Sequence, residues 1–550
     1  MRHTMMHFPL TIGGILTHAA SIHGGVEIAS RLPDGGTHRY RVADFAARVA
    51  RLAGALRGLG LQPGDRVATL MWNHYAHLEA YFAVPAVGGV LNTLNLRMAP
   101  DDIAYIARDA GARFLIVDDI LLPLFERIRA SIEFERVIVV AQDGAATDDA
   151  YVDYEALLAA GEPFERLEPF AGGIDIDENA PASICYTSGT TGRPKGVVYS
   201  HRSIVLHALC ISLPDCFDLS MRQTLAPVVP MFHVNGWCLP FAALLTGVRL
   251  ALPGPRLDAR SLVDWFEQEQ VTLSAGVPSL WCGFIDMLRS APDMRARLSP
   301  ALHLIVAGSA CPEAMMVALD ELGIRSTHAW GMTELSPVGA FSSLKPHLAG
   351  GTAERDDEAL RYRLKQGLPL PFVQTRVMTD SGVAQWDGAS VGELQVRGPW
   401  VAASYHGGVS AQSWTDDRWL RTGDVAHIDG EGYIQITDRL KDLIKSGGEW
   451  ISSVALENAL AGHECVQEAA VVAAPDPKWQ ERPLAFVKLR DGRHATGEDL
   501  IGHLASRFPR WWLPDAVEFV DEIPKTSTGK IQKTVLREIA ATLRAKPELA

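Results

Sequence analysis

Apolar residues along the chain follow two spacings, and these spacings predict its helices and strands. Phe45, Val49, Leu52 and Leu56 recur every three or four positions, which predicts an amphipathic helix. Segment 63–73 then combines a Pro-Gly-Asp turn signal with a short apolar run, so we expect a turn followed by a strand. Helical and strand-like segments alternate in this way along much of the chain.

Compact apolar runs at 113–119 and 136–141 predict buried strands. Residues 303–319 combine a strand pattern, a loop of small residues and a helix with Pro312 in its first turn. Strands that alternate with helices are typical of parallel sheets joined by helical crossovers. The sequence therefore predicts an α/β protein with largely parallel sheets.

The pattern changes near residue 438, where a turn and a strand at 429–437 lead into a highly charged segment. The residues that follow suffice for a compact unit with two helices and three strands before segment 524–530. We therefore expect two domains. Residues 1–438 would form a large N-terminal domain of layered sheets, and residues 439–550 a small, mobile α+β domain.

Composition and charge exclude some classes of function. The 550 residues are 47% hydrophobic and 21% charged, and the net charge of −14 argues against a nucleic-acid partner. The seven cysteines are scattered, odd in number and without zinc-binding spacing, which favours a reducing cytoplasm. Polar residues, glycines or prolines interrupt the apolar segments 1–16 and 238–255, so we expect no signal peptide and no transmembrane segment.

The segment YTSGTTGRPKG, from Tyr186 to Gly196, is the first candidate for chemistry. Glycines let backbone N–H groups approach an anion closely and hydroxyl groups add donors, so the segment suits phosphate. It does not match the P-loop pattern, because Lys195 lies between Pro194 and Gly196 with no Ser or Thr after it. A flexible surface linker is the alternative, although linkers rarely follow a strand with a buried pattern.

Seven motifs stand in a fixed order along the chain: YTSGTTGRPKGV (186–197), PMFHVNGW (230–237), HAWGMTELSP (328–337), GELQVRG (392–398), RTGDVAHID (421–429), DRLKDLIKSGGEWIS (438–452) and PKTSTGK (524–530). With this ordered set the chain resembles the adenylate-forming superfamily of acyl-CoA synthetases, peptide-synthetase adenylation domains and luciferases over essentially its whole length. It is most similar to the bacterial medium- and long-chain fatty acyl-CoA synthetases and 3-methylmercaptopropionyl-CoA ligases.

The resemblance implies a reaction with two half-reactions. A carboxylic acid attacks the α-phosphate of Mg²⁺-bound ATP and releases diphosphate, and the thiol of coenzyme A then displaces AMP from the acyl-adenylate. Such chemistry asks a protein mainly for positioning and charge stabilisation. The first motif would hold the β- and γ-phosphates, and its residues here are Thr187, Ser188, Gly189, Thr190, Thr191, Gly192 and Lys195.

Other motif residues match the family's nucleotide and metal sites. Glu334 would bind Mg²⁺ with Thr187, because hard oxygen ligands suit this ion. Asp424, helped by Arg439, would accept hydrogen bonds from the ribose hydroxyls, and Trp330 would stack on the adenine. The remaining expected nucleotide contacts are Gly308, Ser309, His328, Ala329, Gly331 and Thr333. Without their motifs, these two residues would have ordinary structural interpretations: Glu334 as an acidic residue in the first turn of a helix, and Asp424 as a turn residue.

Lys530 matches the family's catalytic lysine, which reaches the carboxylate and the α-phosphate from a mobile loop; a solvated surface lysine is the alternative. His233 matches a residue on the carboxylate side, although a histidine in an apolar run also suits a core position. Lys441 matches the hinge of a domain movement. The expected contacts to CoA and the acyl group are Lys445, Gly447, Gly448, Trp450 and Trp237, of which Trp237 suits a core position nearly as well.

Two other functions share part of this pattern. An adenylation enzyme that loads a carrier protein would have every nucleotide motif, whereas a nucleotide-binding scaffold without turnover would not need both Glu334 and Lys530. Segments 234–237, 308–310 and 335–338, with Gly331, are nearly all apolar or small and contain no cationic side chain. We therefore expect an aliphatic monocarboxylic acid of medium to long chain, with 3-methylthiopropionate as the alternative. The resemblance also suggests a homodimer.

Overall fold

The computed structural model describes residues 4–142, 150–164, 176–187, 193–349, 357–526 and 530–544. Its first large sheet has seven strands, parallel except for the last pair. In sheet order these strands are β7 (Val152–Asp153), β6 (Arg136–Val140), β5 (Ala112–Asp118), β3 (Arg66–Leu70), β4 (Val90–Thr93), β8 (Pro181–Tyr186) and β9 (Gly196–Ser200). The strands predicted at 63–73, 113–119 and 136–141 are β3, β5 and β6.

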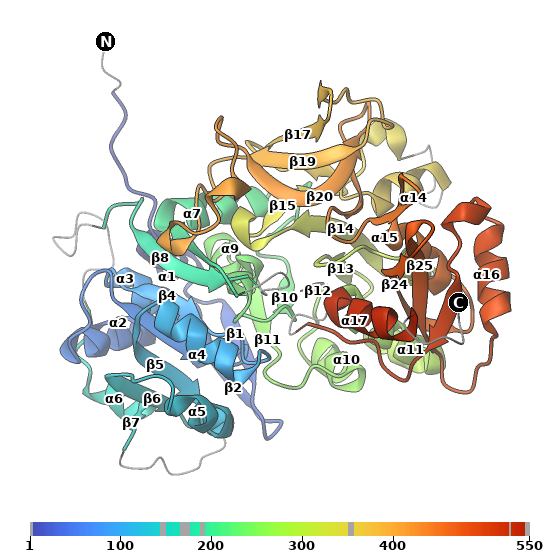
Figure 1. Ribbon diagram of the computed structural model, residues 1–550. Helices are drawn as coiled ribbons and strands as arrows, with labels where there is room; N and C mark the ends of the chain where they lie inside the picture. The colour runs from blue at the N-terminus through green and yellow to red at the C-terminus, as the bar shows by residue number, and fades with distance from the viewer. Residues whose placement is uncertain are drawn as a thin grey trace.

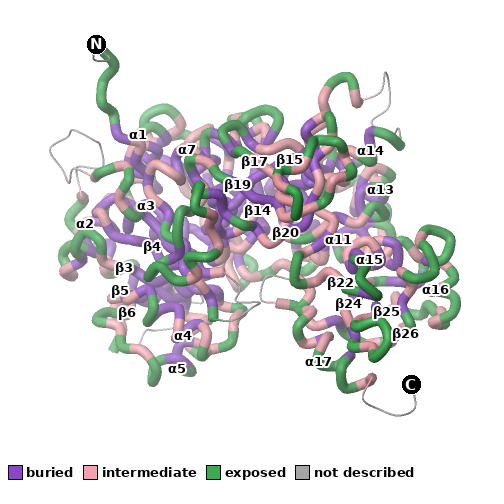
Figure 2. The backbone as a smooth tube through the Cα atoms, turned by 45° about the horizontal axis from the view of Figure 1, so that its top comes forward, coloured by how far each residue is buried: buried purple, intermediate pink, exposed green. Residues whose placement is uncertain are grey.

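The second large sheet has nine strands, of which the six from β14 to β1 are parallel neighbours. In sheet order they are β16 (Leu368–Pro369), β15 (Val338–Phe341), β14 (Arg325–Gly331), β13 (His303–Val306), β12 (Leu273–Gly276), β10 (Thr224–Pro227), β11 (Arg249–Leu252), β1 (Glu27–Arg31) and β2 (Thr37–Arg41). Both sheets occupy the interior of the N-terminal part, where Figure 2 shows mostly buried backbone.

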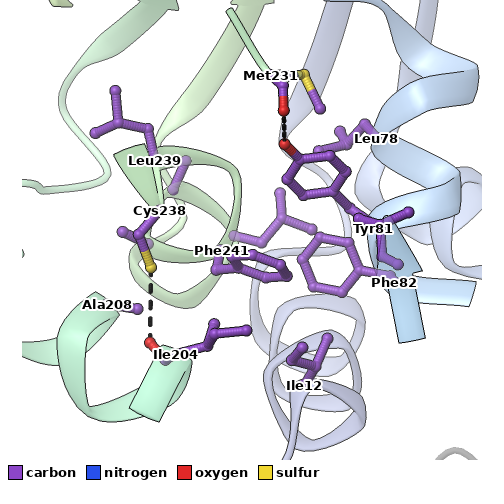
Figure 3. Packing of buried hydrophobic residues seen from close by; sticks show 14 of the residues in the cluster. Ile12, Leu78, Tyr81, Phe82, Ile204, Ala208, Met231, Cys238, Leu239 and Phe241 are labelled. Carbon is purple, nitrogen blue, oxygen red and sulfur yellow. Dashed lines mark hydrogen bonds between the residues drawn. The ribbon is translucent and has the colours of Figure 1, made fainter. Parts of the chain in front are cut away.

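Helices cover these two sheets. They are α1 (Ile12–His23), α2 (Val42–Gly58), α3 (Tyr75–Ala86), α4 (Pro100–Asp109), α5 (Leu122–Arg129), α6 (Tyr154–Ala160), α7 (His201–Ile211), α8 (Val234–Trp237), α9 (Leu239–Thr246), α10 (Ala259–Gln268), α11 (Pro278–Ser290), α12 (Pro292–Arg297), α13 (Glu313–Glu321) and α14 (Asp357–Leu364). The helix predicted from Phe45 is α2, and its predicted apolar positions are fully buried. Ile12 of α1, Phe82 of α3 and Phe241 of α9 pack against one another in the main core (Figure 3).

An antiparallel sheet that the sequence pattern did not predict lies beside the nine-stranded sheet, at the top of Figure 1. Its strands are β18 (Gly382–Val383), β17 (Gln374–Thr379), β19 (Gly392–Arg397), β20 (Leu420–Ile428) and β21 (Ile434–Arg439). Trp330 and Leu335 belong to the same apolar cluster as the buried side chains of these strands, so the sheet is packed onto the end of β14.

The rest of the described chain builds its own sheet, shown in orange and red in Figure 1. Its elements are β22 (Ile444–Ser446), β23 (Glu449–Ile451), α15 (Ser453–Ala461), β24 (Val466–Asp476), β25 (Gln480–Leu489), α16 (Gly497–Ala505), β26 (Ala516–Phe519) and α17 (Lys533–Arg544). We call these elements, with the loops between them, the C-terminal unit, and everything before them the N-terminal part. The unit has apolar clusters of its own on both faces of its sheet. An α/β fold with a smaller C-terminal part is thus confirmed.

Candidate active site

A cavity of about 590 Å³ lies at the carboxyl ends of three neighbouring parallel strands. Pro230 follows β10, Val277 follows β12, and Gly308 follows β13. The carboxyl edge of a parallel sheet is where open α/β folds bind ligands, because the loops there diverge. The β8–β9 connection, strands β20 and β21, and Lys530 of the C-terminal unit complete the lining.

The described ends of the Gly-rich segment are held together at the cavity. Thr187 N–H donates to the Lys195 carbonyl over 2.9 Å, and Lys195 N–H donates to Thr187 Oγ1 over 3.1 Å. The ammonium of Lys195 lies 5.0 Å from the ring centroid of Tyr405, which also lines the cavity. The expected phosphate contacts Ser188, Gly189, Thr190, Thr191 and Gly192 lie outside the described residues.

Glu334 is buried and lies on a short 3-10 turn directly after β14. The Tyr405 hydroxyl donates a hydrogen bond to its Oε1. Burial and the nearby Glu334 carboxylate both raise the pKa of Tyr405, so this hydroxyl keeps its proton. Thr333, the preceding residue, accepts a hydrogen bond from Tyr199 Oη at its carbonyl over 2.7 Å. The Glu334 carboxylate is therefore held at the cavity by a tyrosine that the sequence analysis missed.

Asp424 links the two residues expected at the nucleoside. Its Oδ2 accepts a hydrogen bond from Trp330 Nε1 over 2.9 Å, and its Oδ1 lies 2.7 Å from Arg439 Nε. Asp424 and Arg439 are direct partners in the β20–β21 ladder, which explains their contact. Each carboxylate oxygen has two lone pairs, so Asp424 can still accept hydrogen bonds from a diol.

A second cavity, of about 470 Å³, adjoins the first and shares Gly308, Trp330 and Lys530 with it. Expected nucleotide contacts also line it, and these are Ser309, His328, Ala329, Gly331, Asp424 and Arg439. His328 Nδ1 lies 3.0 Å from the carbonyl oxygen of Leu364, so this nitrogen carries the ring proton and donates. Burial lowers the pKa of His328, which leaves the ring neutral.

Lys530 reaches both cavities from the C-terminal unit. Burial and the cationic Arg439 lower its pKa to about 8, although Asp424 and Glu334 oppose this shift. His233 also lines the first cavity, and burial together with Lys530 lowers its pKa to about 3, so its imidazole is neutral near pH 7. The structure therefore brings the predicted residues of five different motifs together around one cavity.

Four expected CoA contacts lie apart from this cavity. Gly447 and Gly448 form the two-residue connection between β22 and β23, with φ of +60° and +93°. Such a tight hairpin turn needs positive φ at both positions, which gives these glycines a backbone role. Trp450 is 50% exposed, and the ammonium of Lys445 lies 5.6 Å from its ring. Neither side chain lines either cavity.

Trp237 belongs to an unusual stretch of backbone that forms one wall of the cavity. Residues 234–238 all have φ between +37° and +62°. This left-handed conformation is unfavourable for residues other than glycine. A Cβ on Gly308 would lie 3.0 Å from Val277 and 4.0 Å from Trp237, so these residues form a contiguous small and apolar wall. The sequence pattern gave no sign of this left-handed turn.

Buried polar contacts hold the left-handed turn in place. Thr93 Oγ1 donates to Asn235 Oδ1 over 3.0 Å, Asn235 Nδ2 donates to Ser183 Oγ, and Val234 N–H donates to Cys185 Sγ over 3.0 Å. Before the turn, Tyr81 Oη donates to the Met231 carbonyl, and at its last residue Cys238 Sγ donates to the Ile204 carbonyl (Figure 3).

Replacement of Asn235 by alanine is expected to destabilise the protein. The change removes both side-chain hydrogen bonds of Asn235. It leaves the buried Ser183 hydroxyl without this partner and Thr93 with Cys185 alone, at about 1–3 kcal/mol for a group left unsatisfied. Urea unfolding should show a lower midpoint at unchanged slope. The exposed Asn179→Ala is the control, expected within about 0.5 kcal/mol of wild type. Equal midpoints for the two variants would contradict the role of this clamp.

Comparison with protein families identifies the class. The family model "AMP-binding enzyme" matches residues 18–406, and "AMP-binding enzyme C-terminal domain" matches residues 455–530. The chain therefore belongs to the AMP-binding enzymes, and the resemblance to the adenylate-forming acyl-CoA synthetases is confirmed.

Individual relatives are similar over nearly their whole length. A long-chain-fatty-acid–CoA ligase of Thermus thermophilus is 48% identical, with 97% of this chain and 96% of the relative covered. A medium-chain-fatty-acid–CoA ligase of Ectopseudomonas oleovorans is 40% identical, with 97% and 96% covered. A 3-methylmercaptopropionyl-CoA ligase of Ruegeria pomeroyi is 40% identical, with 97% and 98% covered.

The fold has solved counterparts. The structure of an anthranilate CoA ligase in complex with anthranoyl-AMP superposes with a TM-score of 0.84 at 24% identity, covering 99% of this chain and 100% of that one. At this identity the likeness supports the fold, and the chemistry of the site is argued from the residues of this chain.

Proposed function

We propose that this protein is an ATP-dependent acyl-CoA synthetase that converts a carboxylic acid, ATP and CoA into acyl-CoA, AMP and diphosphate through an acyl-adenylate. The observation that carries the proposal is the position of Lys530, from the C-terminal unit, which lines the first cavity with Glu334 and the adjoining cavity with Asp424. A nucleotide-binding scaffold without turnover has no need for a desolvated lysine beside these carboxylates.

The residues have distinct roles in this proposal. Thr187 and Lys195, with residues 188–192, bind the β- and γ-phosphates, and Asp424 with Arg439 binds the ribose. The neutral imidazole of His233 orients the carboxylate of the acid, so that one of its oxygens faces the α-phosphorus. The Lys530 ammonium then offsets the negative charge that grows on the α-phosphate as diphosphate leaves.

The oxygen atoms of Glu334 and Thr187 are suitable ligands for a magnesium ion. The described residues contain no group of three His, Cys, Asp or Glu side chains suited to hold a metal alone. Mg²⁺ needs no such group, because it keeps water and phosphate oxygens among its ligands and takes one or two from the protein. Glu334 and the Thr187 hydroxyl would be those ligands. When bound, the ion would neutralise phosphate charge, and Tyr405 would keep the Glu334 carboxylate in position.

We place the boundary between the two domains at residues 438 and 439, with Lys441 as the hinge. The exposed Trp450 and Lys445, and the turn at Gly447 and Gly448, would reach the cavity after a rotation of the C-terminal unit. That rotation would also withdraw Lys530, so the two half-reactions would use opposite faces of the unit.

The acyl group that we propose is an aliphatic chain of medium to long length. Val229, Val234, Trp237, Val277 and Val338 line the cavity, and the charged lining residues are contributed by other segments. Each buried CH₂ group contributes about 0.8 kcal/mol, whereas a second carboxylate against these side chains would be desolvated without a partner. The relatives named for long-chain and medium-chain fatty acids support the same choice.

The substrate preference is expected to rise with chain length and then level off. The measurement is kcat/KM for CoA-thioester formation with straight-chain acids from C4 to C16, with 3-methylthiopropionate and an aryl acid in parallel. A maximum at 3-methylthiopropionate would select the alternative substrate, which the third relative favours. A preference for dicarboxylic or amino acids would contradict the assignment of the apolar wall. Faster acyl transfer to an acyl carrier protein than to CoA would instead support the alternative function, an adenylation enzyme that loads a carrier protein.

We further propose a cytoplasmic homodimer. All seven cysteines have free thiols, which suits a reducing compartment. Met5, Met6 and Phe8 are exposed near the N-terminus, and Leu209 and Leu213 are exposed at the end of α7, so apolar surface is available for a second copy. Within the described residues no helix has the length and apolarity to cross a bilayer. Light scattering in solution would determine the oligomeric state.

A further inference from the structure

Asp438 occupies a special position between the two parts of the molecule. It is the penultimate residue of β21, three residues before Lys441, and is buried. Its Oδ2 accepts hydrogen bonds from the N–H and the Oγ of Ser453, at 2.6 and 2.7 Å. Ser453 is the first residue of α15, so a carboxylate from the N-terminal part lies at the N-terminus of a helix in the C-terminal unit, where the helix dipole favours negative charge.

The contact continues to the segment that carries Lys530. Lys533, the first residue of α17, donates from Nζ to Ser453 Oγ over 2.6 Å and lies 2.7 Å from Glu457 Oε1. Lys533 is three residues after Lys530. Its contacts therefore fix the start of α17 and limit the positions that Lys530 can take. Lys533, Ser453 and Glu457 all belong to the C-terminal unit. Asp438 belongs to the N-terminal part, so its hydrogen bonds to Ser453 join the two parts of the molecule.

We propose that Asp438 is a positioning residue that holds the C-terminal unit in the orientation for acyl-adenylate formation. A rotation at Lys441 would separate Asp438 from Ser453, whereas the Lys533–Glu457 pair would move as one body. A second contact across the same segment, Ser452 Oγ to the Thr437 carbonyl at 2.5 Å, would be lost with it. The interaction therefore stabilises the first orientation and contributes nothing to the second.

The inference rests on the proposed function and predicts unequal effects on the two half-reactions. In Asp438→Ala the α15 N-terminus loses its anionic partner, so Lys530 is less often aligned with the acid. Diphosphate release from acid and ATP should fall about tenfold to a hundredfold, because small misplacements of reacting groups have effects of this size. Thioester formation from supplied acyl-AMP and CoA should stay within about twofold of wild type.

Matched variants separate positioning from general damage. Asp515→Ala removes ion pairs with Arg482 and Arg544 that lie wholly inside the C-terminal unit, and should leave both half-reactions within about twofold. Ser453→Ala removes the hydroxyl hydrogen bond to Asp438 and keeps the backbone one, so it should have the smaller effect and be non-additive with Asp438→Ala in the first half-reaction. Asp438→Asn, which keeps an acceptor oxygen, should recover part of the rate.

An equal loss of both half-reactions in Asp438→Ala, or unchanged diphosphate release in that variant, would overturn the inference. Thermal unfolding of Asp438→Ala is recorded alongside, so that a fall in both half-reactions of a folded variant counts against the positioning role. Failure of the proposed function would appear elsewhere, as the absence of acid-dependent diphosphate release in the wild-type enzyme.

Discussion

Lys530→Ala is expected to lose acyl-adenylate formation while it keeps thioester formation from supplied acyl-AMP. The ammonium lies at the cavity, among Asp424, Glu334 and Arg439, in the orientation that the structure has. Removal of one charged group that stabilises developing negative charge costs about a hundredfold to a thousandfold in rate. The measurement is acid-dependent diphosphate release beside CoA-thioester formation from synthetic acyl-AMP. Equal losses in the two half-reactions would contradict the division of labour.

The same lysine predicts a pH dependence. Its pKa of about 8 in the free enzyme means that the ammonium is present below pH 8 and loses its proton as the pH rises. The value of kcat/KM for diphosphate release should therefore fall above pH 8, because this parameter reports groups of the free enzyme. Lys345→Ala, which removes an ion pair with Glu431 elsewhere in the N-terminal part, should keep the wild-type profile. The same profile in Lys530→Ala would assign the titration to another group.

Glu334→Gln is expected to reduce diphosphate release by orders of magnitude at ordinary Mg²⁺ concentration. The amide keeps the size of the side chain and can still accept from Tyr405, but it loses the anionic oxygen that a hard cation requires. The measurements are the rate of diphosphate release across a Mg²⁺ titration and the Mg²⁺ dependence of ATP binding by calorimetry.

A matched carboxylate tests the specificity of that result. Glu431→Gln removes the partner of Lys345 and should leave the Mg²⁺ dependence unchanged. Wild-type diphosphate release by Glu334→Gln, with an unchanged Mg²⁺ requirement for ATP binding, would remove Glu334 from the metal site.

The two large sheets were predictable because their buried strands are short apolar runs between helices. The helix at Phe45 and the strands at 113–119 and 136–141 follow from this local signal alone. The antiparallel sheet from β17 to β21 was missed as a sheet. Its strands carry a mixture of buried and exposed positions, and their pairing depends on contacts distant in sequence.

The residues that the structure places at the two cavities were predicted from their motifs, whereas the contacts between them were not. Asp424 and Trp330 are 94 positions apart, and Tyr405 and Glu334 are 71 apart. No periodicity in one sequence reports such pairs, because they depend on how β14, β20 and the loop after β19 meet. The left-handed turn at 234–238 was equally hidden, since valine, tryptophan and cysteine do not favour positive φ.

The central claim is that this protein activates a carboxylic acid as its adenylate, and isotope transfer tests it most directly. A medium- or long-chain fatty acid labelled with ¹⁸O in both carboxyl oxygens is converted with ATP and CoA, and the products are weighed by mass spectrometry. Attack on the α-phosphate leaves one labelled oxygen in AMP for each acyl-CoA formed, and none in diphosphate. Label in inorganic phosphate or diphosphate, or CoA-thioester formation with unlabelled AMP, would contradict the account.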